Sequence, residues 1–412
     1  MSTISRSVQN RITATIFVGQ ALFSAGTIAA FTITPIIARN LSDTNYAGMP
    51  QTLGQAGRAI FAYFVGWLMI KFGRRQTLSY GYLLAGLGGA LSIVAVMQQQ
   101  FWILLLGGLL IGLARGATEQ GRYVAAEVYR PENRAPILGI IVAAGTIGSV
   151  LGPNIVTPSQ WVAERLGLDV ATGPYIFTLG VMVIAALAMF FFLRPDPGIL
   201  SQQINEEIDD PAVIKKPARP QGELLRLPRV QLAIVAMSIG FLVMVLLMVI
   251  TPLHMDNLGQ DSAAISRVIM FHTLGMFAFS WMTGFFIRRV GQIWVIMIGA
   301  LTLIAACIIA PIASSVWMLS VALYLLGLGW NFAYVGGSSL LTVSVTEAER
   351  PRMQSTAEAV VAVSSMLASL STGFIYGNLG MVMTGVVGFV ASAILILVLF
   401  WTVPRKPASY AA

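Results

Sequence analysis

Three ionisable residues lie inside one apolar stretch of the chain, at the spacing of a single helix face. Arg115, Glu119 and Arg122 are four and three residues apart, and side chains at these intervals lie on the same side of an α-helix. Charges this deep in a helix of membrane-spanning length are seldom left facing hydrocarbon, because lipid does not solvate them. The two arginines favour the charged form of Glu119. The spacing is compatible with proton exchange at Glu119, in competition with Arg115, and equally with a static salt-bridge triad that holds the helix in place.

Two further charged residues are candidates for the same chemistry. Glu358 is a second candidate for proton exchange, although its position close to the start of an apolar run favours an interaction at a helix end. Arg58 lies near the middle of another apolar run. We consider three roles for Arg58: lining the interface between the two domains, attracting an anionic substrate, and serving as a buried partner of Glu119.

The composition indicates which kind of element must hold these charges. Of the 412 residues, 57% are hydrophobic and 10% are charged, whereas soluble globular proteins carry about 25% charged residues. About 20 apolar residues form a helix long enough to cross a bilayer. We therefore predict an all-α membrane protein with twelve transmembrane helices, over residues 12–37, 47–70, 77–97, 101–128, 135–157, 173–193, 230–254, 263–287, 293–312, 316–343, 353–377 and 380–402.

The basic residues are unequally divided between the links on the two sides of the membrane. Nineteen Lys and Arg residues fall in the set of links that includes both chain ends, and three fall in the opposite set. Because cytoplasmic links carry the excess of Lys and Arg, we predict a multi-pass protein of a bacterial inner (plasma) membrane with both termini in the cytoplasm. The formal net charge of +8 follows from this topology, and we expect no nucleic-acid partner.

One link is much longer than the others and divides the predicted spans into two sets of six. Residues 194–228 are polar and Pro-rich and contain an acidic run, a composition typical of a flexible connector. We predict an N-terminal bundle over residues 1–193, a cytoplasmic linker over 194–228 and a C-terminal bundle over 229–412. Two pairs of similar segments lie at corresponding places in the two halves, at an offset of about 216 to 218 residues: Gly66 to Arg75 with Gly284 to Gly291, and Glu132 to Arg134 with Glu349 to Arg352. Such an offset indicates parallel repeats, which favour a cavity between the two bundles.

The sequence contains no pattern typical of a cofactor or metal site. Its two histidines and its single cysteine, Cys307, form no cluster at ligand spacing. The glycine-rich fragments lie within predicted spans and lack the strand–turn–helix setting that phosphate binding requires. We therefore expect a protein that is not an enzyme and that holds no cofactor or metal.

The end of the second predicted span resembles a signature of the major facilitator superfamily, a family of membrane transporters, and the resemblance extends over essentially the whole chain. It implies two pseudo-symmetric six-helix bundles that alternate in access to the two sides of the membrane. In this signature glycines permit close helix packing and basic residues grip neighbouring helix ends, which assigns roles in conformational change to Gly66, Lys71, Gly73 and Arg74. The usual acidic residue falls on Ile70 here. Glu127, at the end of span four, is a possible partner for Arg74 or Arg75.

The fifth predicted span resembles the signature of drug/proton antiporters of the same superfamily. Gly139 is followed at the family spacing by Gly148, Gly152 and Pro153, although Val156 and Thr157 replace its last two glycines. Gly148 and Gly152 form a small-residue stripe suited to close helix approach. Pro153 removes a backbone hydrogen bond and can kink the helix.

The resemblance also implies which helices face the substrate. In the superfamily, spans one, four, seven and ten line the central cavity, and Met-rich surfaces adapt to varied apolar ligands. The side chains expected in this cavity are Gln20, Ser24, Thr27 and Phe31 of span one, Phe241 and Met244 of span seven, and Asn331 and Tyr334 of span ten, with Arg58 of span two beside them.

These features favour a secondary active transporter that couples proton entry to efflux of small organic or lipophilic compounds. We expect a small-molecule substrate, contact with membrane lipid and function as a monomer. Uptake of an organic anion is an alternative, because Arg58 and Arg115 lie near mid-membrane with few acids beside them. A receptor or scaffold that has lost transport is a remote alternative, suggested by Ile70 in place of the signature's acid.

Overall fold

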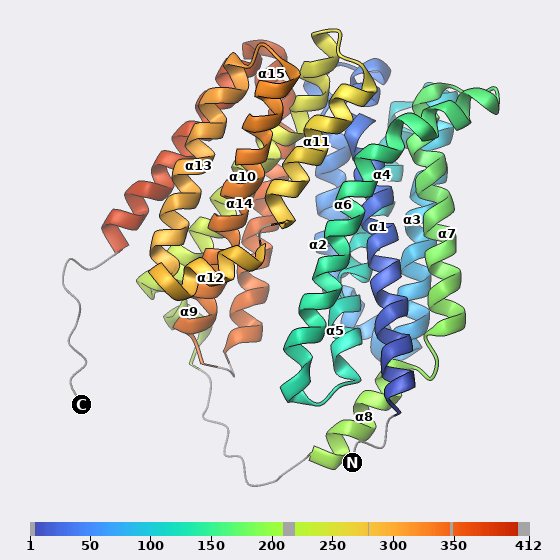
Figure 1. Ribbon diagram of the computed structural model, residues 1–412, viewed down its shortest axis with the longest axis vertical. Coiled ribbons are helices and arrows are strands. Elements are labelled where there is room, and N and C mark those ends of the chain that lie inside the picture. Colours follow the sequence, from blue (N-terminus) through green and yellow to red (C-terminus); the bar gives the residue numbers. More distant parts are fainter. Residues whose placement is uncertain (1–4, 209–218, 279, 347–348, 403–412) are drawn as a thin grey trace.

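The protein is an all-α membrane protein built from two helical bundles (Figure 1). The computed structural model describes residues 5–208, 219–278, 280–346 and 349–402. The first bundle contains α1 (Arg6–Leu41), η1 (Thr44–Tyr46), α2 (Met49–Phe72), α3 (Arg74–Met97), α4 (Phe101–Thr118), α5 (Gly121–Glu127), α6 (Pro131–Arg165), η2 (Val170–Thr172) and α7 (Gly173–Phe192). After α8 (Pro197–Ile208) and α9 (Gln221–Leu224), the second bundle contains α10 (Pro228–Asn257), α11 (Ser262–Phe277), α12 (Ser280–Val290), α13 (Gln292–Ile312), α14 (Val316–Ser344) and α15 (Arg350–Thr402).

The helices of the described residues account for the twelve predicted spans. Nine helices are long and apolar enough to cross a membrane, and two pairs bent at a break bring the number to 11. The long helix α15 consists of two helices that meet at Gly380, where φ is 75° and the backbone is not helical. Its two parts correspond to predicted spans eleven and twelve.

The predicted repeat is visible in the backbone of the two halves. Gly73 separates α2 from α3 with φ 84° and ψ 164°, and Gly291 separates α12 from α13 with φ 87° and ψ 162°. Glycine adopts such positive φ values without steric cost, unlike residues with a Cβ. The spans that precede these turns are also both bent, by 54° after Phe61 and by 43° after Phe277.

Two spans predicted as single helices are interrupted. Predicted span four breaks at Glu119 and Gln120, between α4 and α5, and predicted span eight breaks after α11. The sequence does not reveal these breaks, because neither contains a proline and each span is apolar overall. The fifth span continues as α6 to Arg165, beyond its predicted end at residue 157.

Where the structure describes the linker, it packs against the bundles and is not the free connector that its composition predicts. Helix α8 packs against α5 and α3, because Leu200 and Ile204 form an apolar pair one turn apart and both are buried. The carboxylate of Asp196 accepts hydrogen bonds from the backbone N–H groups of Arg74 and Arg75, at 3.3 and 3.0 Å. Residues 209–218, with part of the acidic run, lie outside the described residues.

The other end of the linker is attached to the second bundle. Arg219 donates to both carboxylate oxygens of Glu349, at 2.8 and 2.9 Å. These hydrogen bonds, with one from the backbone N–H of Thr346, hold the pKa of Glu349 well below its usual range. Each described end of the linker is therefore anchored to the bundle beside it.

The two bundles are joined by polar contacts at the end opposite α8, which we call the far end (top of Figure 1). Arg39, in the last turn of α1, donates to Asp256 at 2.7 Å and to Asn257 at 2.6 Å, both at the end of α10. Among the described residues, the other polar contacts that join the bundles towards this end are Ser369 to the Gly48 carbonyl, Asn378 to Asn45, Gln160 to Ser262, Asn154 to Met270 Sδ, and Thr273 to the Ser149 carbonyl.

Removal of the Arg39 contacts is expected to loosen the far end. We predict that Asn45→Cys and Asn378→Cys, whose native side chains are hydrogen bonded at 3.1 Å, form a disulfide under oxidation in a Cys307→Ala background. Adding Arg39→Gln should slow this cross-linking about fivefold, since an exposed ion pair contributes up to about 1 kcal/mol. Arg165→Gln, which removes an exposed arginine stacked on Trp161, is the control and should not change the rate. Equal rates in all three proteins would show that Arg39 does not hold the far end closed.

Candidate functional site

Glycines bring the backbones of α2 and α4 into contact and thereby position the charged side chains. A Cβ on Gly112 would overlap the carbonyl oxygen of Gly54, and a Cβ on Gly57 would lie 2.5 Å from the carbonyl oxygen of Leu109. Only residues without a side chain allow this approach. As a result, Arg58, one residue beyond Gly57, lies beside the C-terminal end of α4.

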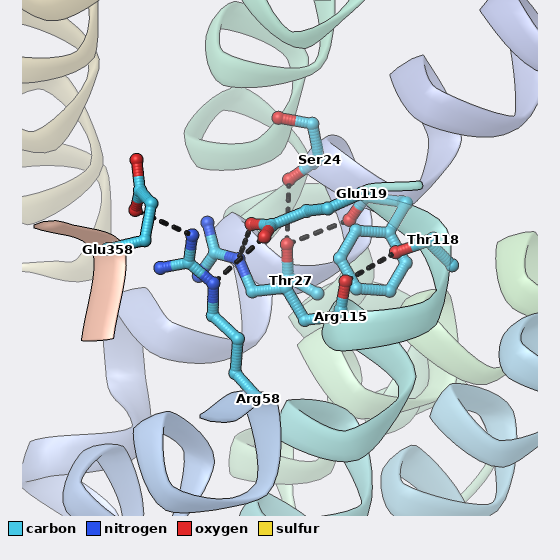
Figure 2. Close-up of polar contacts among 8 residues, drawn as sticks. Ser24, Thr27, Arg58, Arg115, Thr118, Glu119 and Glu358 are labelled. Atoms are coloured by element: carbon cyan, nitrogen blue, oxygen red, sulfur yellow. Dashed lines mark hydrogen bonds and ion pairs between the residues drawn. The ribbon is translucent and has the colours of Figure 1, made fainter. Parts of the chain in front are cut away.

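The centre of the site is Glu119, at the break between α4 and α5. Its two carboxylate oxygens accept hydrogen bonds from Arg58 Nε at 2.8 Å and from Arg115 Nε at 3.2 Å (Figure 2). The Glu119 side chain retains 28% of its exposure and that of Arg58 22%, so water reaches these ions even though they lie within a span. Of the roles considered for Arg58, the hydrogen bond confirms that of partner to Glu119.

The same arginine faces the second bundle. Arg58 Nη2 lies 4.0 Å from Glu358 Oε2 on α15, as Figure 2 shows. Glu358 in turn accepts a short hydrogen bond from the Tyr334 hydroxyl of α14. The expected helix-end interaction of Glu358 is therefore wrong, since its partners lie in the bundle interior. The polar network runs from α4 through α2 to α15 and α14, and thus crosses between the bundles.

Arg122 does not complete the triad that its spacing predicts. Helix α4 ends at Thr118 and α5 begins at Gly121, so residues 115 and 122 are not on one continuous helix face. The Arg122 guanidinium lies 4.7 Å from the centre of the Tyr123 ring. Its Nε atom is buried and has no hydrogen-bond partner among the described residues.

Aromatic side chains form the wall opposite the charged residues. The rings of Trp330 and Tyr334 are stacked with an interplanar angle of 8° and centroids 5.2 Å apart. Phe241 meets both rings edge-on, with centroids 5.2 Å from each, while Met244 is buried in the core of the second bundle. Tyr334 also borders a cavity of about 340 Å³ that continues along α14 past Ser338, Ser339 and Thr342.

Only part of the predicted stripe on α1 reaches this region. Phe31 lines a small cavity together with Arg115 and Gln55, and the Gln20 Oε1 atom is buried without a partner among the described residues. Ser24 instead donates to the Gly145 carbonyl of α6 at 3.1 Å. Thr27 is buried and donates to carbonyls of its own helix. The prediction of a cavity role for these two residues is wrong, because Ser24 is turned towards α6 and the Thr27 hydroxyl is bonded within its own helix.

Asn331 was also predicted to line the cavity, and the structure places it elsewhere. Its side-chain amide donates to the Met276 carbonyl at 2.7 Å and to Ser280 Oγ at 2.8 Å, and its carbonyl pairs with Thr283. These partners flank the break between α11 and α12. Asn331 therefore satisfies polar groups that the interrupted helix exposes, and its role is structural.

The signature segment from Gly66 to Arg75 forms one ion pair that the sequence predicts. Arg74 Nε lies 3.2 Å from Glu127 Oε2, so the predicted partner of this arginine is confirmed. A Cβ on Gly73 would lie 2.6 Å from Asp196, so this glycine is closely packed. Gly66 has open space around it, and the prediction of close helix packing at Gly66 is wrong. Lys71 lies 4.8 Å from the centre of the Trp67 ring on its own helix instead of gripping a neighbouring helix end.

The signature segment from Gly139 to Pro153 packs α6 against α1. A Cβ on Gly148 would overlap the Ala21 carbonyl, and one on Gly152 would lie 2.8 Å from the Ala25 carbonyl. The predicted stripe of close approach is therefore confirmed at these two glycines but not at Gly139, which has open space. Helix α6 continues through Pro153 to Arg165.

Several residues of the site and its surroundings were not singled out from the sequence. Gln55 and Trp330 are both buried with a side-chain polar atom that lacks a partner among the described residues. A glutamine within an apolar run is a signal that could have been used for Gln55. Arg39 and Asp196 gave no such signal, because their partners are far away in the sequence. Within the described residues, no group of three or more His, Cys, Asp or Glu side chains could hold a metal ion.

The glycine contact between α2 and α4 can be tested by a matched pair of substitutions. Gly112→Ala should destabilise the protein by about 1–3 kcal/mol, because the added methyl group forces the two backbones apart. Gly180→Ala, at a helical glycine with open space, should be neutral or stabilising by up to about 1 kcal/mol. Cys307 is the single cysteine and is buried, so a thiol-reactive fluorogenic dye reports thermal unfolding in detergent. Equal unfolding midpoints for the two variants would contradict a backbone contact at Gly112.

The family model and the relatives that match this chain point to the same family. The family model described as Major Facilitator Superfamily matches residues 16–266 and 232–411. Two proteins of Bacillus subtilis (strain 168), the uncharacterized MFS-type transporters YdeG and YddS, are each 30% identical to the chain. The first alignment covers 96% of this chain and 93% of the relative, and the second covers 93% and 88%. The riboflavin transporter RfnT of Brucella anthropi is 26% identical over 88% of each chain.

Solved structures have the same fold. A bacterial homolog of the human lysosomal transporter Spinster, in an inward-facing and occupied conformation, has a TM-score of 0.73 at 14% identity and covers 97% of each chain. A D-xylose-proton symporter has a TM-score of 0.69 at 13% identity, covering 93% of this chain and 96% of its own. The family model matches nearly the full length of the chain. The charged network between the two bundles therefore belongs to a transporter, and the chain is a member of the major facilitator superfamily.

Proposed function

We propose that this protein is a proton-coupled antiporter that exports small organic compounds by alternating access. The observation that carries the proposal is the position of Arg58, which is hydrogen bonded to Glu119 in its own bundle and lies 4.0 Å from Glu358 in the other. A carboxylate that is alternately protonated and paired with this arginine would link proton movement to the contact between the bundles.

The two carboxylates differ in how firmly they are held. Glu119 accepts from two arginines, while Glu358 has one arginine at 4.0 Å and the hydroxyl of Tyr334. Glu358 is also the more exposed of the two, at 39% against 28%. Glu358 is therefore the less firmly held of the two carboxylates, and we assign the proton-exchange role to it.

Protonation of Glu358 would weaken the link between the bundles. Two unit charges 4 Å apart attract by about 4 kcal/mol at an effective dielectric constant of 20, and by less where water screens them. Loss of an interaction of this size shifts a two-state equilibrium severalfold or more. Arg58 then remains with Glu119, and the second bundle is free to move relative to the first.

We place the protein in a bacterial inner membrane with both termini in the cytoplasm and as a functional monomer. The excess of basic residues on the side of the termini supports this orientation. In it, the far-end contacts of Arg39 close the outer side, and the cavity along α14 lies towards the cytoplasm.

Uptake of an organic anion is the second candidate function. It is favoured by the surplus positive charge of Arg122 and by the relative named a riboflavin transporter, whose name states no direction of transport. A receptor or scaffold without transport is less supported, because Arg74 keeps an acidic partner in Glu127 although Ile70 replaces the signature's acid.

Transport by inside-out membrane vesicles tests coupling and direction. With riboflavin, ethidium and 2-naphthoate as probes, we expect at least one probe to accumulate in vesicles with an acidic interior, and this accumulation to collapse on addition of a protonophore. Glu358→Gln and Glu119→Gln should each reduce uphill accumulation at least about tenfold while downhill exchange persists, since a neutral amide cannot carry the proton.

The control for these variants is Glu164→Gln, at an exposed carboxylate near the end of α6, which should transport like the wild type. Uphill accumulation that survives the protonophore would refute proton coupling. Accumulation by intact cells instead of inside-out vesicles would favour the uptake function.

A further inference from the structure

The charges around the cavity do not balance. Arg58 and Arg115 are matched by Glu119 and Glu358 in the network of Figure 2. The buried Nε atom of Arg122 has no hydrogen-bond partner among the described residues, and the guanidinium lies 4.7 Å from the centre of the Tyr123 ring. It lies within electrostatic range of both Glu119 in the first bundle and Tyr334 in the second. An unmatched cation in a partly buried site is unfavourable unless something of opposite charge joins it.

The second bundle carries a rigid aromatic platform at Tyr334, a residue that interacts electrostatically with Arg122. Tyr334 is stacked flat on Trp330, is flanked by Phe241, and is held at its hydroxyl by Glu358. Trp330 is 6% exposed, and its indole N–H has no partner among the described residues. Rings that are fixed in this way offer a flat ligand contact area at low entropic cost.

The adjoining cavity has a size and lining that suit a small ring system. Its volume is about 340 Å³, and it is bordered by Tyr334, Ser338 and Ser339. Cavities that bind small organic molecules begin at about 300 Å³ and combine apolar walls with a few polar groups. A lipophilic cation would fit the aromatic wall but would be repelled by Arg122.

We propose that the substrate is a planar aromatic organic anion, with its ring against Tyr334 and its negative group on Arg122. The proposal rests on the proposed transport function and narrows its substrate class. The ring supplies stacking against the platform, and the anionic group forms charge-assisted hydrogen bonds with the guanidinium. The serine hydroxyls of α14 are available to other polar atoms of the ligand.

Calorimetric titration of the purified full-length protein in detergent tests both parts of this recognition. The probes are 2-naphthoate, its neutral counterpart 2-naphthamide, and cyclohexanecarboxylate, which has the charge without the flat ring. We expect 2-naphthoate to bind at least about tenfold more tightly than either of the others, as one charge-assisted hydrogen bond or one stacked ring implies. Arg122→Gln should abolish the preference for 2-naphthoate over 2-naphthamide, and Tyr334→Leu should abolish the preference over cyclohexanecarboxylate.

Two further variants separate recognition from general damage. Arg122→Lys should retain part of the anion preference, and Arg165→Gln should retain all of it, since Arg165 also stacks on an aromatic ring but is exposed at the end of α6. Thermal unfolding of each variant, followed through Cys307, shows whether it is folded. The inference is overturned if 2-naphthoate shows no preference or does not bind, or if folded Arg122→Gln keeps the preference.

Binding in detergent requires neither a gradient nor transport, so the two proposals can fail separately. Selective binding of 2-naphthoate by a protein that moves no probe uphill would refute the transport function and support the site. Uphill transport of ethidium without selective 2-naphthoate binding would refute the site and support transport.

Discussion

The need to keep ionised side chains away from lipid governs the centre of this protein. A carboxylate within a membrane span is stable only beside cations or water, and Glu119 has two arginines and partial exposure. One of these arginines comes from a different helix, so α2 and α4 must approach until their backbones touch. The glycines at 54, 57 and 112 make this approach possible. Helix packing in the first bundle therefore follows from an electrostatic requirement.

The two bundles contribute different chemistry to the space between them. The first supplies Arg58, Arg115, Glu119 and Arg122, and the second supplies a single carboxylate and stacked aromatic rings. Polar contacts elsewhere between the bundles lie towards the far end, remote from the linker. A charged network midway along the bundles and hydrogen bonds at the far end are compatible with two bundles that rock about a central site.

The sequence was sufficient for the number of spans, their approximate ends and the repeat, because hydropathy, basic residues and glycines act locally. It also identified Glu119 as the central carboxylate. It could not show how each helix is rotated about its axis, and this is why Thr27 and Asn331 were wrongly placed in the cavity. The interruption of span four lies in residues that are compatible with a helix, so the loss of Arg122 from the triad depends on tertiary packing. The docking of the linker likewise depends on partners distant in sequence.

The turns at Gly73 and Gly291 have nearly the same backbone angles, although their neighbours differ. Arg74 and Arg75 follow the first turn, whereas Gln292 and Ile293 follow the second. Duplication of an ancestral half would copy both the turn and the charges beside it. The turn and a basic residue two positions before it, Lys71 and Arg289, are shared, whereas the two arginines after the first turn are not. Each half has thus been free to acquire its own electrostatic partners on a common skeleton.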